Sequence, residues 1–296
     1  MALRRLSRCA IAPPAPAITM HPALPATIAS ILSSAGLGLL AWLGMSIVLL
    51  HARADLASAL HPLQMCALLI GTVLAAALLA PVPGHHGRSA LSSWRTGWSP
   101  RAKLLGLATL AIATTLLIVL GQIAPSGGRA MALGALGLLL ALSALSAVAA
   151  IAMAHTVDGP APGRSLVLPM HLLFALALGL GLLFLLMAWL LPFGAGDSGM
   201  LITLTVLGAL LAACLLLYWR DVRRSRSGDG RDRHDGGDRP LRYGSLALLV
   251  AVPLACALLA RAPSLAAMPW LALTVGSLLC GAMLERWRFF SQPRTR

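Results

Sequence analysis

The chain has 296 residues, of which 58% are hydrophobic and only 11% are charged. A soluble domain carries about 25% charged residues, so this composition excludes an ordinary soluble enzyme and any long disordered region. A net charge of +14 would suggest nucleic-acid binding in a soluble protein, but in a membrane protein it indicates orientation. We therefore expect the chain to contact a lipid bilayer and no nucleic acid.

Eight apolar runs are long enough to cross a bilayer, which takes about 20 residues in a helix. Because lipid offers the backbone no hydrogen-bond partner, these runs must be helical. The sequence predicts an all-α integral membrane protein, a bundle of about eight transmembrane helices forming a single domain over residues 20–296. The seventh run is the shortest and contains Pro253. The predicted spans are 24–50, 57–79, 103–123, 130–153, 166–191, 200–218, 245–259 and 264–284.

Positive charge is divided unequally between the two sides of this bundle. Twenty of the 23 Lys and Arg residues fall on the side that holds both chain termini and the loops after the second, fourth and sixth spans. The other side holds only Arg53, Arg129 and Arg261. We call the side with the 20 charges the basic end. The positive-inside rule places it, with both termini, in the cytoplasm.

Two segments lie outside the predicted spans. Residues 1–19 contain Arg4-Arg5, but no apolar stretch of seven to fifteen residues follows, so we expect a disordered or spurious N-terminal extension and no cleaved signal. Residues 220–242 mix eight Arg with five Asp and several Gly. This composition predicts a flexible charged loop, with docking of a partner subunit as the alternative.

No motif for a resident cofactor or a catalytic domain is present. The five cysteines are scattered singly, without the close spacing that holds zinc or an iron–sulfur cluster. Only His171 lies clearly inside a span, whereas bis-histidine haem ligation needs a pair on facing helices. We expect no catalytic residue, metal site, haem, iron–sulfur cluster or molybdenum in this chain.

Ionisable side chains at membrane depth are costly and are therefore candidates for function. His85, His86, His155 and His171 fall near the basic ends of spans two to five at similar depth, and Glu285, the only glutamate, ends the eighth span there. These groups titrate within reach of neutral pH, so they can accept the protons released when a hydroquinone is oxidised. The alternative interpretation is that they simply meet water and lipid headgroups.

Other features have structural explanations. Trp94, Trp98, Trp219 and Trp287 are interpreted as anchors at the membrane interface. Residues 33–38 form a patch of small side chains that predicts close helix packing and no chemistry. No Asp or Glu lies in the interior of a predicted span, which disfavours a transporter with acidic groups at the bilayer midplane.

Seven landmarks follow one another along the chain. They are Met20-His21-Pro22-Ala23, Ser33-Ser34-Ala35-Gly36-Leu37-Gly38-Leu39-Leu40, His85-His86-Gly87-Arg88, Ser93-Trp94-Arg95-Thr96-Gly97-Trp98-Ser99-Pro100-Arg101, Ala152-Met153, Leu217-Tyr218-Trp219-Arg220 and Glu285-Arg286-Trp287-Arg288-Phe289-Phe290. In this order they resemble the membrane-anchor subunit of the dimethyl sulfoxide reductase family (DmsC-type). This resemblance implies an eight-helix protein of the bacterial inner membrane that holds a molybdopterin catalytic subunit and a four-cluster iron–sulfur subunit. It also implies exchange of electrons with menaquinone or ubiquinone, so the chain would be a non-catalytic or quinol-oxidising subunit.

The resemblance also implies roles for individual residues. The segment His85-His86-Gly87-Arg88 matches the family's His-Leu-Gly-Arg, so His85 and His86 would transfer protons while Arg88 polarises a quinone carbonyl. A family glutamate associated with quinol oxidation falls at Ala102, where the carboxylate is missing. Two alternatives therefore stay open: an anchor that has lost quinol chemistry, and a small-molecule transporter.

Overall fold

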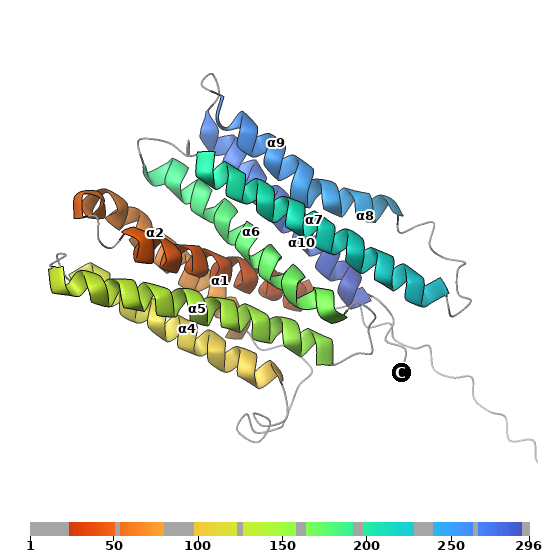
Figure 1. Ribbon diagram of the computed structural model, residues 1–296, viewed down its shortest axis with the longest axis horizontal. Coiled ribbons are helices and arrows are strands. Elements are labelled where there is room, and N and C mark those ends of the chain that lie inside the picture. The colour runs from red at the N-terminus through yellow and green to blue at the C-terminus, as the bar shows by residue number, and fades with distance from the viewer. Residues whose placement is uncertain are drawn as a thin grey trace, which may run out of the picture.

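The computed structural model describes residues 24–50, 54–79, 98–122, 127–157, 164–191, 198–227, 239–262 and 266–291. Within these ranges, eight helical segments are long and apolar enough to cross a membrane. They run side by side as a bundle in which consecutive segments alternate in direction (Figure 1). The predicted all-α bundle of eight spans is thereby confirmed. The proposed N-terminal extension, residues 1–19, lies outside the described residues.

The observed helices match the predicted spans closely at most ends. Four ends differ by five residues or more: α4 begins before residue 103 and α8 before residue 245, while α7 continues past residue 218 and α10 past residue 284. A helix satisfies its backbone hydrogen bonds internally and can therefore extend beyond the apolar layer. The helices are α1 (Leu24–Leu50), α2 (Ala54–Ala76) followed by the 3-10 turn η1 (Ala77–Leu79), α4 (Trp98–Gln122), α5 (Gly127–Val157), α6 (Arg164–Leu190), α7 (Ser198–Ser227), α8 (Arg239–Leu246), the π-helical turn η3 (Ala247–Ala251), α9 (Val252–Leu259) and α10 (Ala267–Ser291).

The charged segment 220–242 is therefore less of a loop than the sequence suggested. Residues 220–227 belong to the last turns of α7, and residues 239–242 begin α8. Residues 228–238 lie outside the described residues. The arginines on α7 are consequently held on a helix that projects from the basic end.

The seventh span is continuous despite Pro253. Proline lacks an N–H donor, and its ring clashes with the carbonyl group four residues earlier. The chain widens into η3 at this place, and the Val252 N–H donates to the carbonyl oxygen of Ala247, five residues back. One π-helical turn thus accommodates the proline, and the segment Pro240–Leu259 still has the length and composition of a membrane span.

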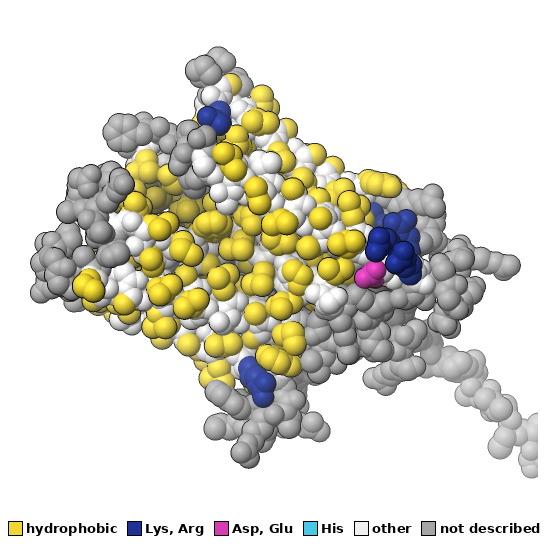
Figure 2. All heavy atoms as spheres, viewed as in Figure 1, with side chains coloured by type: hydrophobic (Ala, Val, Ile, Leu, Met, Phe, Trp, Pro, Cys, Tyr) yellow, Lys and Arg dark blue, Asp and Glu magenta, His cyan; other side chains and the backbone are white. Residues whose placement is uncertain are grey.

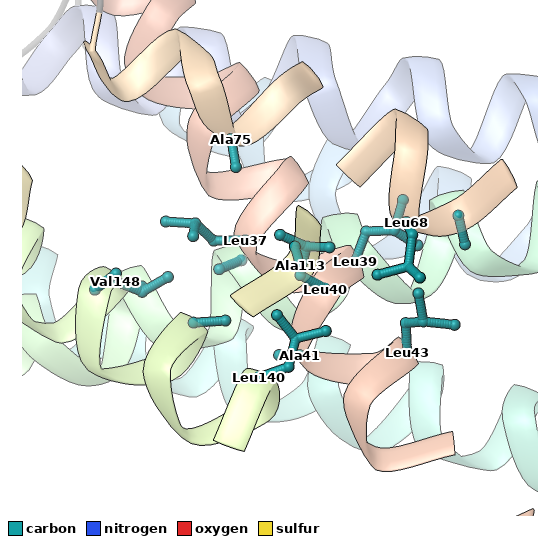
Figure 3. Close-up of a cluster of buried hydrophobic side chains, with 14 of the residues drawn as sticks. Leu37, Leu39, Leu40, Ala41, Leu43, Leu68, Ala75, Ala113, Leu140 and Val148 are labelled. Atoms are coloured by element: carbon teal, nitrogen blue, oxygen red, sulfur yellow. The ribbon is translucent and has the colours of Figure 1, made fainter. Parts of the chain in front are cut away.

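Helix α1 is the central element of the bundle. In its most apolar stretch 72% of the residues are buried, against 22% for α4. It packs against α2, α5, α6 and α10. Figure 3 shows five of its side chains meeting residues of α2, α4 and α5 in the largest hydrophobic cluster. The labelled residues are Leu37, Leu39, Leu40, Ala41, Leu43, Leu68, Ala75, Ala113, Leu140 and Val148.

Glycines let the neighbours of α1 approach closely. A Cβ atom on Gly38 would collide with the backbone of Ala175 in α6, and one on Gly179 would collide with the backbone of Gly38. Farther along α1, a Cβ on Gly44 would come within 2.5 Å of the carbonyl oxygen of Gly137 in α5. Close packing through small residues, predicted for residues 33–38, is confirmed, and it continues beyond that patch.

The outer surface matches a lipid environment. Large apolar side chains such as Leu49, Val73 and Ile202 are exposed. Figure 2 shows one face whose middle is hydrophobic, while Lys and Arg gather at the end where α7 stops and α8 starts. The bundle therefore presents apolar surface along its length and charge at its end.

Candidate functional site at the basic end

The last turns of α10 carry two neighbouring charged residues that are buried. Glu285 is 7% exposed and Arg286 is 6% exposed. Successive residues on a helix point about 100° apart, so the two side chains face different neighbours. Buried charge is not limited to α10, because Arg242 in the span Pro240–Leu259 is also buried.

Glu285 contacts the start of the seventh span. The Ser245 hydroxyl lies 2.6 Å from Oε1 of Glu285 and 2.9 Å from the carbonyl oxygen of Arg242. A hydroxyl has a single hydrogen and donates it to the carboxylate when Glu285 is ionised. The Ser245 hydroxyl therefore lies between the Glu285 carboxyl group of α10 and the Arg242 carbonyl oxygen of α8.

Arg286 contacts the start of the first span instead. Its guanidinium donates to the hydroxyl of Ser30 and, at 2.8 Å, to the hydroxyl of Ser34. The two serines lie four residues apart on α1 and so occupy the same face. The patch at residues 33–38 was predicted to determine packing alone. Ser34 shows that it also supplies a polar contact for a buried charge.

Apolar and aromatic residues surround these polar contacts. Tyr218 and Trp219 of α7 are buried in one hydrophobic cluster with Phe174 of α6 and Ala282 of α10. Trp219 is only 5% exposed. The interpretation of Trp219 as an anchor at the membrane interface is therefore wrong, because the side chain packs inside the bundle.

Trp98 has a partly different environment. It is half-buried at the start of α4. The guanidinium carbon of Arg101 lies 5.1 Å from the centre of its ring, which is within reach of a cation–π contact. This contact lies within the first turn of α4, at the basic end.

His171 is half-buried on α6, one turn before Phe174. Its Nδ1 lies 2.9 Å from the carbonyl oxygen of Val167. Since a carbonyl oxygen only accepts, Nδ1 donates, and Nε2 is then the ring nitrogen that can take up a proton. Because Met170 and Phe174 pack in the same cluster as Ala282 and Met283, His171 and Glu285 belong to helices around one common core.

The structure places the other candidate residues unevenly. His85, His86 and Arg88 lie outside the described residues. His155 is in the last turn of α5, but its side chain is not described. His171 follows the first residue of α6 by seven positions, about 10 Å along the axis, whereas His155 precedes the end of α5 by two, about 3 Å. Measured from their helix ends, the two histidines differ in depth.

The position that matches the family glutamate lies in the hydrophobic core. Ala102, in the second turn of α4, is 4% exposed and belongs to the largest hydrophobic cluster. Gly106, one turn later, packs against Leu78. This part of α4 thus contributes packing where the resemblance would place a carboxylate.

Sequence reasoning missed Arg286 and Arg242 as buried groups, because it counted them only as orienting charges. One pattern does indicate the Arg286 site. Thr27, Ser30 and Ser34 follow one another by three and four residues, so they form a polar stripe on one face of an apolar span. Such a stripe at the basic end predicts a polar partner on a neighbouring helix.

Within the described part of the chain, no three His, Cys, Asp or Glu side chains lie together in a way that would hold a metal ion. The polar groups of the site are instead spread over α1, α6, α8 and α10. In comparisons with known proteins, no family model, curated protein or solved structure matches this chain.

Proposed function

We propose that this chain is the membrane-anchor subunit of a molybdopterin oxidoreductase complex of the dimethyl sulfoxide reductase type. It exchanges electrons between the quinone pool and an iron–sulfur partner subunit. The observation that supports this most directly is the buried Glu285–Ser245 contact at the basic end, on helices that share a hydrophobic core with the helix of His171. These groups can hold protons within the membrane, as quinol chemistry requires.

The reaction needs proton acceptors here and an electron acceptor elsewhere. Oxidation of a quinol to a quinone releases two protons and two electrons. Nε2 of His171 and the carboxylate of Glu285 accept protons, together with His85 and His86, while Arg88 polarises a quinone carbonyl oxygen. The electrons pass to an iron–sulfur cluster of the partner subunit. Reduction of quinone uses the same groups in the opposite direction.

The basic end is the surface for that partner. Arg220, Arg223 and Arg224 are exposed on the last turns of α7, where they can meet acidic groups of another subunit. Under the positive-inside rule this end faces the cytoplasm of a bacterium, with the bundle in the inner membrane.

Purification under mild conditions tests the proposal. A tagged full-length chain is extracted from its native membranes in a mild detergent. It is expected to copurify with partner subunits that contain stoichiometric molybdenum and iron. Replacing Arg220, Arg223 and Arg224 together by Glu is expected to release those subunits, whereas Arg261→Glu at the opposite end is the matched control. A chain that purifies without iron or molybdenum under these conditions contradicts the proposal.

Two other functions have specific support. The burial of Arg242, Glu285 and Arg286 supports a small-molecule transporter, because transport sites use buried ionisable groups, although these three residues lie at span ends and not at the bilayer midplane. Solute uptake by the isolated chain in proteoliposomes would favour that function. The core position of Ala102 favours an anchor without quinol chemistry. For such an anchor we expect the complex to assemble, but its quinol turnover to be no higher than that of the catalytic subunits alone.

A further inference from the structure

An open apolar groove of about 180 Å³ lies on the outside of the bundle between α1 and α10. It opens toward the surrounding lipid, because Ile28 and Cys280 on its walls are exposed. The remaining wall residues are apolar. The groove is lined by Ile28, Ile31, Leu32, Leu279, Cys280 and Met283.

Polar groups continue the walls of this groove toward the basic end. On α10, Arg286 follows Met283 by three residues and Leu279 by seven, so it stands in the same row along the helix. On α1, Thr27 precedes Ile31 by four residues and stands in row with it. The Arg286 contacts to Ser30 and Ser34 connect the two helices at this level. Arg286 and the hydroxyl groups of Thr27, Ser30 and Ser34 therefore lie on the same two helices as the groove, nearer the basic end.

The charge of this cluster calls for an anion. Both recorded hydrogen bonds of Arg286 go to neutral hydroxyl groups, although its side chain is buried. Oγ1 of Thr27 is also buried and has no hydrogen-bond partner among the described residues. A buried cation is strongly destabilising unless a counter-charge and hydrogen bonds compensate it. A neutral quinone carbonyl supplies no counter-charge, whereas a phosphate does, and arginine binds phosphate in a bidentate manner.

We infer that the groove and the Thr27–Arg286 cluster bind one anionic phospholipid. Its phosphate is held by Arg286 and Thr27, and one acyl chain lies in the groove. The depth fits, because Arg286 is the next-to-last residue of the span Ala267–Trp287 and Thr27 is the first residue of the span Thr27–Leu50. This inference is independent of the quinone-linked function.

Thermal unfolding of the full-length chain in a mild, delipidating detergent tests the inference. Added phosphatidylglycerol is expected to raise the Tm, whereas phosphatidylcholine, diacylglycerol, inorganic phosphate and a short-chain ubiquinone are not. Arg286→Met is expected to raise the phosphatidylglycerol concentration needed for the half-maximal shift about tenfold or more, since it removes charge-assisted hydrogen bonds. The exposed Arg261, at the opposite end, provides the matched control Arg261→Met, which is expected to respond like the wild type.

Two further measurements keep the test decisive if Arg286→Met does not fold. Thr27→Val preserves side-chain shape and removes only the hydroxyl, and it is expected to weaken the phosphatidylglycerol response a few-fold. Native mass spectrometry is expected to find one anionic phospholipid retained by the wild type and lost from the variants.

Several outcomes overturn the inference. An equal rise in Tm with diacylglycerol or phosphatidylcholine would mean that the groove binds acyl chains without regard to the headgroup. A shift with inorganic phosphate alone would assign the cluster to a free anion, and a shift with the ubiquinone alone would assign it to quinone. A phosphatidylglycerol response that is unchanged in Arg286→Met and Thr27→Val would remove both residues from the site.

Discussion

Glu285 and Arg286 are adjacent in the chain and have different partners in space. Glu285 accepts a hydrogen bond from Ser245 of the seventh span, and Arg286 donates to Ser30 and Ser34 of the first span. Because these partners belong to opposite ends of the sequence, two consecutive residues connect the beginning of the bundle with its last two spans. The end of α10 therefore joins the first and seventh spans through polar contacts, between the membrane interior and the basic end.

The proton-holding role that we propose for His171 can be tested by a matched pair of variants. His171→Gln is expected to lower quinol-dependent turnover of the complex at least tenfold, because a positioned proton acceptor contributes about 10²–10⁴-fold to a rate. His61→Gln is the control, since His61 is also half-buried but lies near the start of α2, at the opposite end. Turnover is measured with reduced quinone analogues in isolated membranes. Equal rates in the two variants would exclude His171 from the proton path.

A second substitution concerns the position where the family glutamate is missing. Ala102→Glu is expected to destabilise the protein by about 3–5 kcal/mol, because it places an unpaired carboxylate in the core around α4. Lys103→Glu, at the exposed neighbouring position, is expected to change stability by less than about 0.5 kcal/mol. Thermal unfolding in detergent compares the two. A stable Ala102→Glu variant that also gains quinol turnover would show that the site accepts the family carboxylate.

At the scale of helices, the central position of α1 depends on residues without side chains. Gly38 and Gly179 let α1 and α6 approach until their backbones touch, and Gly44 and Gly137 do the same for α1 and α5. The indole Nε1 of Trp42 donates to the carbonyl oxygen of Leu176 at 2.9 Å and adds a specific contact between α1 and α6. Van der Waals packing of this kind is the main attraction between helices in lipid.

A pair of alanine substitutions measures this packing. Gly38→Ala is expected to destabilise the bundle by about 1–3 kcal/mol, because its Cβ meets the rigid backbone of Ala175. Gly276→Ala is expected to be neutral or to stabilise by up to about 1 kcal/mol, since nothing lies within 4 Å of its added Cβ. Both glycines are in spans, so thermal unfolding in the same detergent compares them directly. Equal effects would mean that α1 and α6 are less closely packed than described.

The face of the molecule drawn in Figure 2 is apolar along its length, and Lys and Arg gather at the end where α7 stops. The alternating direction of eight spans brings the start of α1 and the end of α10 together at the basic end, as the contact between Ser34 and Arg286 requires. Reporter fusions are expected to find residues beyond α10 and residues between α7 and α8 in the cytoplasm, and the turn between α1 and α2 outside it. A fusion after α10 that reports the outside would contradict this orientation.

The sequence alone determined the class of fold and the approximate limits of the spans. Uninterrupted apolar runs leave the backbone no partner except itself, and this constraint acts locally, so it can be read from the chain without knowing any contact. The same locality explains the errors at the ends of α7 and α10, where polar residues continue a helix that hydropathy alone would stop. The π-helical turn before Pro253 was likewise hidden, because apolar composition does not distinguish hydrogen-bond registers.

The tertiary structure alone decided which polar residues meet. More than 200 positions separate Ser30 from Arg286, and neither these two residues nor Ser245 stands out in its own segment. The burial of Trp219, Arg242 and Glu285, and the core position of Ala102, depend on which helix face turns inward. In a span that is apolar on every side, hydropathy carries almost no information about that rotation, and only the packing of small residues against neighbouring helices fixes it.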